Sequence, residues 1–199
     1  MTTQTELTPD KYLSKNELSK LLTTVTEKAT LDKAKGRTVW PRIEMMIQLA
    51  SNTGMRVAEL VDIQVHEVNT GHEPSVYVSN GKGGKPRLIP ISNQLKKRLK
   101  DFINANELKP TDCLFNVNGR QYSTMGLQQQ FKKAARAAGL DSMYSIHSLR
   151  HTYGTYLYEK EKDLRMVQRH LGHASLATVQ IYVGVSKERS YQAVNGLYD

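Results

Sequence analysis

Cysteine, long apolar runs and acidic residues are all scarce in this 199-residue chain. Its single cysteine, Cys113, has no partner for an internal disulfide, which fits a reducing cytoplasm. No segment approaches the roughly 18 consecutive apolar residues of a membrane span, and residues 1–6 lack the basic and apolar regions of a secretory signal. We therefore expect a cytoplasmic protein with no membrane partner.

Metal-binding and nucleotide-binding signatures are also missing. The sequence has no cysteine cluster, no His-Glu metal signature and no carboxylate group of the kind that a two-metal nuclease needs. The glycine-rich run at 81–84 lacks the Walker spacing, and Pro86 stands where Ser or Thr should follow Lys85. We expect neither a metal nor another cofactor.

The shortage of acidic residues leaves a strongly basic chain. Lys and Arg number 28 against 19 Asp and Glu, giving a net charge of +9 and a pI near 9.6. This balance indicates a polyanionic partner. Basicity alone fits DNA, RNA or an anionic lipid surface equally well.

Apolar periodicity predicts a mainly helical α+β fold with a small antiparallel sheet. Ser14 and Glu17 form a capping box that starts the first helix, and a polar connector is expected over 30–38. Helical spacing continues over 41–51, after Thr53, over 94–105, from Ser123 to Ala138, after Ser145, over 163–171 and after Ser175. Over 75–91 the apolar period changes to two, which predicts a β-hairpin.

Two stretches place cations where an anion could bind. Thr53 is expected to cap a helix with Arg56 in its first turn, where the helix dipole disfavours a cation unless an anion arrives. Glu59, three residues later, could instead neutralise Arg56 in a structural pair. Lys82, at the tip of the predicted hairpin, is either an exposed turn residue or an acid that swings onto a bound phosphate.

The stretch His147-Ser148-Leu149-Arg150-His151 places His147 and Arg150 on one helical face. A forked guanidinium beside a proton-exchanging imidazole suits a phosphate, although surface pairs with this spacing are common. Earlier in the chain, Lys132, Lys133 and Arg136 make one side of a helix basic, and such a helix could lie along a DNA groove.

Five motifs in this order resemble the tyrosine recombinase, or phage integrase, family over most of the chain, from about Tyr12 to about Tyr191. They are Thr53-Gly54-Met55-Arg56-Val57-Ala58-Glu59-Leu60, Gly81-Lys82-Gly83, His147-Ser148-Leu149-Arg150-His151, Leu171-Gly172-His173 and Tyr182. The resemblance implies the family's catalytic domain. It also implies site-specific DNA cleavage and rejoining through a 3′-phosphotyrosine, without metal or nucleotide.

The resemblance further implies a set of catalytic residues: Arg56, Lys82, His147, Arg150, His173 and Tyr182. Arginine forks would hold the phosphate and stabilise charge in the transition state. Tyr182 would be the nucleophile, Lys82 the acid for the leaving 5′ oxygen, and His147 the base, while His173 would orient the phosphate. Supporting roles are expected for Glu59, which braces Arg56, and for His151.

The remaining expectations concern DNA contacts and assembly. Basic residues expected to contact DNA are Lys85, Arg87, Lys132, Lys133 and Arg136. Double-stranded DNA is the expected partner of a bacterial or phage-encoded, nucleoid-associated protein. We expect a monomer without DNA and a homotetramer on paired sites, with accessory DNA-bending proteins possible. The segment from Ser186 to Asp199 would pack on a neighbouring protomer.

Residues 1–12 are expected to form a flexible tail and 13–199 the catalytic domain, without the helical core-binding domain that typical family members carry in front. This pattern fits a naturally short recombinase or a fragment of a longer integrase. Two alternatives use the same fold: a DNA-binding regulator that does not recombine, and a related topoisomerase that relaxes supercoils.

Overall fold

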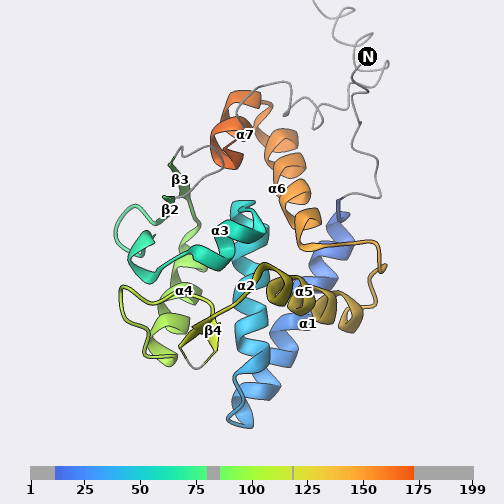
Figure 1. Ribbon diagram of the computed structural model, residues 1–199. Helices are drawn as coiled ribbons and strands as arrows, with labels where there is room; N and C mark the ends of the chain where they lie inside the picture. The colour runs from blue at the N-terminus through green and yellow to red at the C-terminus, as the bar shows by residue number, and fades with distance from the viewer. Residues whose placement is uncertain (1–11, 80–85, 118, 173–199) are drawn as a thin grey trace, which may run out of the picture.

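Helices dominate the computed structural model (Figure 1), which describes residues 12–79, 86–117 and 119–172. The helices are α1 (Lys15–Ala34), α2 (Val39–Thr53), α3 (Val57–Asp62), the 3-10 turn η2 (Val65–Glu67), α4 (Asn93–Ala105), α5 (Thr124–Ala137), α6 (Ile146–Glu161) and α7 (Leu164–Leu171). The strands are β1 (Val68–Asn69), β2 (Ser75–Val78), β3 (Arg87–Pro90), β4 (Asn116–Val117) and β5 (Arg120–Gln121). The predicted mainly helical α+β fold is confirmed.

The first helix begins at the predicted capping box. The Ser14 hydroxyl accepts from the Glu17 amide at 3.3 Å, and the Glu17 carboxylate accepts from the Ser14 amide at 2.9 Å. The helix runs to Ala34, so the connector predicted from residue 30 begins too early. Asp32 lies inside the helix and holds the following loop against it. Its backbone carbonyl accepts from the Arg37 amide, and its carboxylate accepts from the Trp40 amide.

Thr53 does not cap the next helix, as the sequence had suggested. It is the last residue of α2, and its hydroxyl donates to the carbonyl of Leu49 at 2.6 Å. Gly54 then ends α2 in the left-handed conformation, with φ +60°. As a result, α3 begins later than predicted, with Arg56 at its N-cap position.

The main core lies between α1, α2, α5 and the start of α6, with α4 and the sheet packed around it (Figure 1). Its largest fully buried side chains include Leu21, Ile43, Met46, Ile47, Leu60, Phe115 and Phe131. Met45 and Met46 also belong to this core. A smaller apolar cluster joins α6 to α7 through Tyr153, Leu157, Val167 and Leu171.

The three-stranded sheet is antiparallel in the order β1-β2-β3. Val76 pairs with Ile89 and Val78 with Arg87, so the two predicted hairpin strands are confirmed, and the predicted tip with Lys82 lies outside the described residues. β1 was not predicted, because two residues are too few to show a period. β3 also contacts α7, which places the hairpin strands beside this helix (Figure 1).

Among the described residues after 119, α5 and α7 begin and end within one residue of the predicted positions, and the helix predicted after Ser175 lies outside the described residues. Ser123 caps α5, accepting from the Gly126 amide at 3.0 Å, and Gly139 follows with φ +60°. Asp163 caps α7, which ends at the left-handed Gly172. These caps fix where α7 stops, and the carbonyls at that end become part of the site below.

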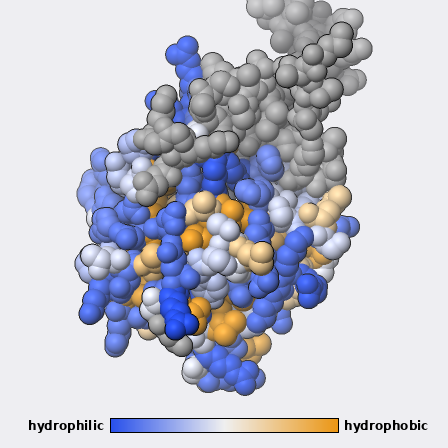
Figure 2. All heavy atoms as spheres, in the orientation of Figure 1, coloured by the Kyte–Doolittle hydropathy of each residue, from blue (hydrophilic) through white to orange (hydrophobic). Residues whose placement is uncertain are grey.

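None of the described helices is long and apolar enough to cross a membrane. The face shown in Figure 2 is largely hydrophilic, with smaller hydrophobic areas between the polar side chains.

Candidate functional site

Three arginines from different elements converge on the C-terminal end of α7. Each donates to one of three successive carbonyls: Arg87 to His170 at 2.7 Å, Arg150 to Leu171 at 2.7 Å and Arg56 to Gly172 at 3.3 Å. Carbonyls at a helix end lack helical partners and carry the negative end of the dipole, so guanidinium groups stabilise them. Arginines from α6, β3 and the start of α3 thus meet at the end of α7.

Arg150 is held from two sides. It is 6% exposed, and its second amino group donates to the carbonyl of Gly54 at 2.7 Å. One buried guanidinium therefore joins α6 to α7 and to the loop that leads to Arg56. Because its orientation is fixed in advance, a phosphate that meets this side chain encounters a preorganised cation.

Glu59 links the arginines to one another. Its buried carboxylate accepts from the Arg56 amide at 2.7 Å and the Arg56 guanidinium at 3.0 Å, and it also receives two bonds from Arg87. Burial raises the pKa of Glu59, but the hydrogen bonds and charge of Arg87, followed by those of Arg56, outweigh burial and lower the pKa overall. The carboxylate is ionised at neutral pH.

The structural pairing of Arg56 with Glu59 and an anion-binding role for Arg56 are compatible. The salt bridge occupies one edge of the guanidinium, while the side chain keeps 22% of its surface exposed. Arg56 stands at the N-cap of α3, where its side chain makes no capping hydrogen bond and where the helix dipole disfavours a cation. Glu59 offsets this cost and orients the side chain.

His147 lies on the outer face of α6, one turn before Arg150. Partial burial, with the positive charges of Arg150 and then Arg56, lowers the pKa of His147 below its usual value. Both arginines are thus close enough to act on the imidazole electrostatically. A neutral imidazole near two cations can accept a proton at neutral pH.

Tyr153 and His170 form a pair that the sequence did not indicate. The Tyr153 hydroxyl and His170 Nδ1 are 2.7 Å apart, and the rings stack across the α6–α7 contact. Burial raises the pKa of Tyr153 to about 12, and burial followed by nearby Arg169 and Arg87 lowers the pKa of His170. A tyrosine and a histidine on adjacent helices carry no local pattern that would have revealed this pairing.

Other site predictions differ in what the structure says of them. His151 is partly buried on α6 and has at least one interaction partner. The hydroxyls of Tyr144 and Tyr156 donate to the Glu17 carboxylate and the Leu13 carbonyl. Four predicted residues lie outside the described residues, and their roles remain predictions: Lys82, Lys85, His173 and Tyr182.

The predicted DNA contacts divide into two kinds. All three guanidinium nitrogens of Arg87 bind groups of the protein, and the Glu59 carboxylate already neutralises its charge, which does not fit a DNA contact. Lys132 donates to the carbonyls of Ser142 and Tyr144 and so braces the loop before α6. Lys133 lies over the ring of Trp40 and, like Arg136, is exposed. The exposed pair remains available to a polyanion.

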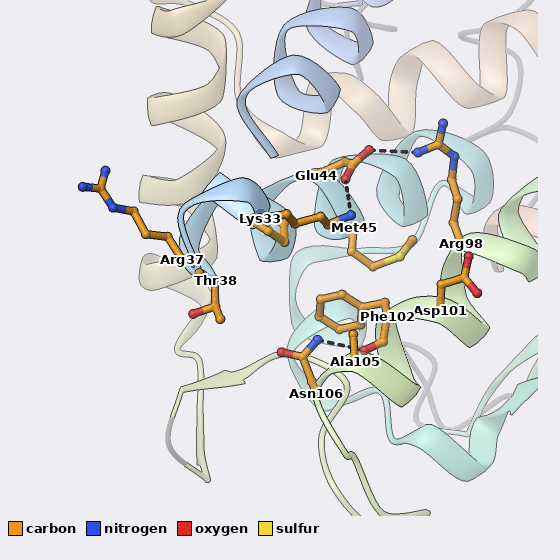
Figure 3. Close-up of a pocket in the computed structure, with 12 residues that line it drawn as sticks. Lys33, Arg37, Thr38, Glu44, Met45, Arg98, Asp101, Phe102, Ala105 and Asn106 are labelled. Carbon is orange, nitrogen blue, oxygen red and sulfur yellow. Dashed lines mark hydrogen bonds and ion pairs between the residues drawn. The ribbon is translucent and has the colours of Figure 1, made fainter. Parts of the chain in front are cut away.

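Among the described residues, no group of three or more His, Cys, Asp or Glu is arranged to hold a metal ion. A cavity of about 450 Å³ lies away from Arg56, Arg87 and Arg150, between the α1–α2 loop and α4 (Figure 3). Glu44 spans it with ion pairs to Arg98 at 2.8 Å and Lys33 at 3.8 Å. Met45 and Phe102 also line the cavity, so we interpret the cavity as a surface hollow beside the core.

This fold and site define a helical domain in which three guanidinium groups meet at one helix end, with His147 one turn before Arg150. The chain belongs to the Phage integrase family, whose sequence profile matches residues 11–189. It is 35% identical over 157 residues to tyrosine recombinase XerC of Corynebacterium glutamicum, covering 77% of this chain and 50% of that protein. To tyrosine recombinase XerD of Halalkalibacterium halodurans it is 34% identical over 180 residues, covering 86% and 59%.

Solved structures show the same likeness. The fold matches XerH site-specific recombinase bound to difH substrate with a TM-score of 0.79 and 28% identity, covering 100% of this chain and 56% of that one. It matches XerA recombinase with a TM-score of 0.75 and 26% identity, covering 96% and 65%. The chain spans about half the length of the curated relatives it matches.

Proposed function

We propose that this chain is the catalytic part of a site-specific recombinase that cuts and rejoins double-stranded DNA through a 3′-phosphotyrosine. The observation that carries the proposal is the convergence of Arg56 and Arg150 on one helix end, with His147 one turn before Arg150 on α6. Family membership and the DNA-bound XerH relative support it.

In this mechanism the two guanidinium groups hold the nonbridging oxygens of the scissile phosphate. The Tyr182 hydroxyl attacks phosphorus and passes its proton to His147 as the new P–O bond forms. The bond to the 5′ oxygen breaks, and Lys82 protonates that oxygen, while His173 orients the phosphate. The reverse sequence joins a new 5′-hydroxyl, so the phosphotyrosine conserves the energy of the broken bond.

Assembly follows from the reaction. Exchanging two duplexes requires four strand cuts, so we propose a homotetramer on paired sites, formed from monomers when DNA binds. Accessory DNA-bending proteins would help to bring the sites together. The segment from Ser186 to Asp199, outside the described residues, would contact a neighbouring protomer.

A suicide-substrate assay tests the proposal. Nicked duplexes drawn from the DNA that flanks this protein's own gene trap any covalent protein–DNA intermediate, which is resolved on a denaturing gel. We expect an adduct with the wild-type chain in the presence of a chelator, and none with Tyr182→Phe, which should still bind DNA.

Two results would contradict the assignment. An adduct from Tyr182→Phe would mean that another residue is the nucleophile. Salt-sensitive binding without any adduct, even after a helical clamp domain is added in trans, would favour a DNA-binding regulator. Relaxation of plasmids that lack a recombination site would instead favour a topoisomerase.

A further inference from the structure

We propose that Arg87 is a positioning residue of the cleavage site, which holds Arg56 and the end of α7 in place through Glu59. The inference rests on the proposed function, because it concerns the geometry of the same site. It replaces the expectation that Arg87 contacts DNA.

The first support is the fork between Arg87 and Glu59. Both terminal amino groups of Arg87 bind the carboxylate, at 2.8 and 2.7 Å, and the two side chains are 7% and 3% exposed. Paired parallel hydrogen bonds fix the plane of the carboxylate as well as its position. Glu59 can therefore present a defined edge to Arg56.

The second support is the third bond of Arg87. Its Nε donates to the carbonyl of His170 at 2.7 Å, so one side chain connects β3, α3 and α7. Gly172 allows this approach, because a Cβ there would lie 3.1 Å from both Cδ and Nη1 of Arg87. The next two carbonyls along the chain, those of Leu171 and Gly172, are the ones that Arg150 and Arg56 bind.

The third support is electrostatic. Arg56, Arg87 and Arg150 bring like charges to one helix end, and Glu59 is the carboxylate that binds two of them. Without the Arg87 fork, Glu59 could rotate toward Arg56 alone, and the guanidinium of Arg56 would change its direction. A displacement of about 1 Å in a phosphate-binding group can lower a rate on the order of 100-fold.

The test compares Arg87→Lys with a matched control, Arg98→Lys. Lysine keeps the charge but cannot form a fork. Arg98 also binds a glutamate, Glu44, at 2.8 Å, but it is 35% exposed and lies beside the distant cavity (Figure 3). We expect Arg87→Lys to slow adduct formation on the order of 100-fold, with DNA affinity and its salt dependence unchanged. Arg98→Lys should match wild type.

A double-mutant cycle asks whether Arg87 acts through Glu59. If it does, Glu59→Gln together with Arg87→Lys should be little slower than Glu59→Gln alone. Multiplied effects would mean that Arg87 acts independently and would overturn the proposal. Weaker binding with a shallower salt dependence in Arg87→Lys would restore the DNA-contact interpretation and overturn it as well.

A spectroscopic measurement separates this proposal from the function on which it rests. The ¹⁵N signal of Arg56 Nε, recorded without DNA, should shift in Arg87→Lys and stay in place in Arg98→Lys. This holds even if the wild-type chain forms no adduct, in which case only the cleavage function fails. If Arg87→Lys does not fold, Arg87→Gln serves, and an unshifted Arg56 signal in a folded Arg87 variant would overturn the positioning role.

Discussion

Glu59 is a buried carboxylate that serves two guanidinium groups at once. Removing one partner from a buried ion pair leaves an uncompensated charge, which typically costs about 3–5 kcal/mol. The two partners of Glu59 have different surroundings. Arg56 lies at the candidate site, and Arg87 also binds a carbonyl at the end of α7. A residue of this kind influences both folding and the geometry of the guanidinium groups that we propose to bind the phosphate.

His147 has the opposite electrostatic situation, since the charges near it are positive. Partial burial, Arg150 and Arg56 all lower the pKa of His147. A lowered pKa favours the neutral imidazole, so the base form persists as the pH falls through about 6.5, the usual histidine value. Adduct formation should therefore hold its rate to a lower pH than an unperturbed histidine would allow.

Replacing Arg56 with Gln tests this electrostatic account. Loss of one positive charge should raise the pKa of His147, as measured by NMR titration of the imidazole. His170 is the internal control: burial, Arg169 and Arg87 lower its pKa, so it should not respond. Equal shifts of both histidines would indicate a general structural change, and no shift of His147 would refute the coupling.

At the scale of single residues, the sequence predicted the pairing of residues close in the chain, but it did not predict which side chains are buried. The Arg56–Glu59 pair could be predicted because three residues separate its members, a spacing that helices bring together. Arg87 looked like a surface base near a basic hairpin tip. Its burial depends on Glu59 and α7, which are distant in sequence, and no local pattern encodes that contact.

At the scale of elements, the loop from α2 to α3 packs tightly against α6 and α7 at Gly54. A Cβ on Gly54 would lie 2.6 Å from Leu171 Cδ2 and from Tyr153 Cδ1, and the residue has φ +60°. The carbonyl of Gly54 also binds Arg150. Close approach at this glycine lets α6 and α7 reach the loop that carries Arg56.

Gly54→Ala should therefore destabilise the protein by about 3 kcal/mol, combining left-handed strain of about 1 kcal/mol with overpacking of about 2 kcal/mol. Gly36→Ala is the matched control, because Gly36 has φ +65° but nothing within 4 Å of an added Cβ. It should cost only the strain of about 1 kcal/mol. Urea unfolding of both variants measures the difference, and equal losses would exclude a steric role for Gly54.

Helix starts could be predicted where the capping side chain and the backbone amide that it binds are close in sequence. Ser14 and Ser123 cap the helices that the sequence assigned to them, and Asp163, predicted as the first residue of its helix, caps α7. Thr53 failed as a cap because its hydroxyl bonds back to the preceding turn, a choice that depends on where the chain turns next.

For the whole molecule, the net charge of +9 divides into structural and available cations. Arg87, Arg98 and Lys132 are engaged by glutamates or carbonyls. Arg136, near the end of α5, is exposed. Only cations of the second kind can release counterions from DNA, so basicity overstates the binding surface.

Arg136→Gln should accordingly weaken DNA binding without affecting the fold. We expect the slope of log affinity against log salt concentration to become shallower by about 1, the contribution of one phosphate contact. Arg98→Gln, the control, should leave the slope unchanged. Fluorescence anisotropy across a salt series measures both, and an unaltered slope for Arg136→Gln would remove this residue from the interface.

The sequence by itself determined the fold class, the approximate place of most helices and the identity of the family. Caps, periodicity and short motifs are all local, so their chemistry can be recognised without coordinates. Only the tertiary structure decided which cations face inward, because burial and pairing join residues that are far apart in the chain. The convergence of Arg56, Arg87 and Arg150 on the end of α7 is of this second kind, since each arginine comes from a different element and meets the others only after folding.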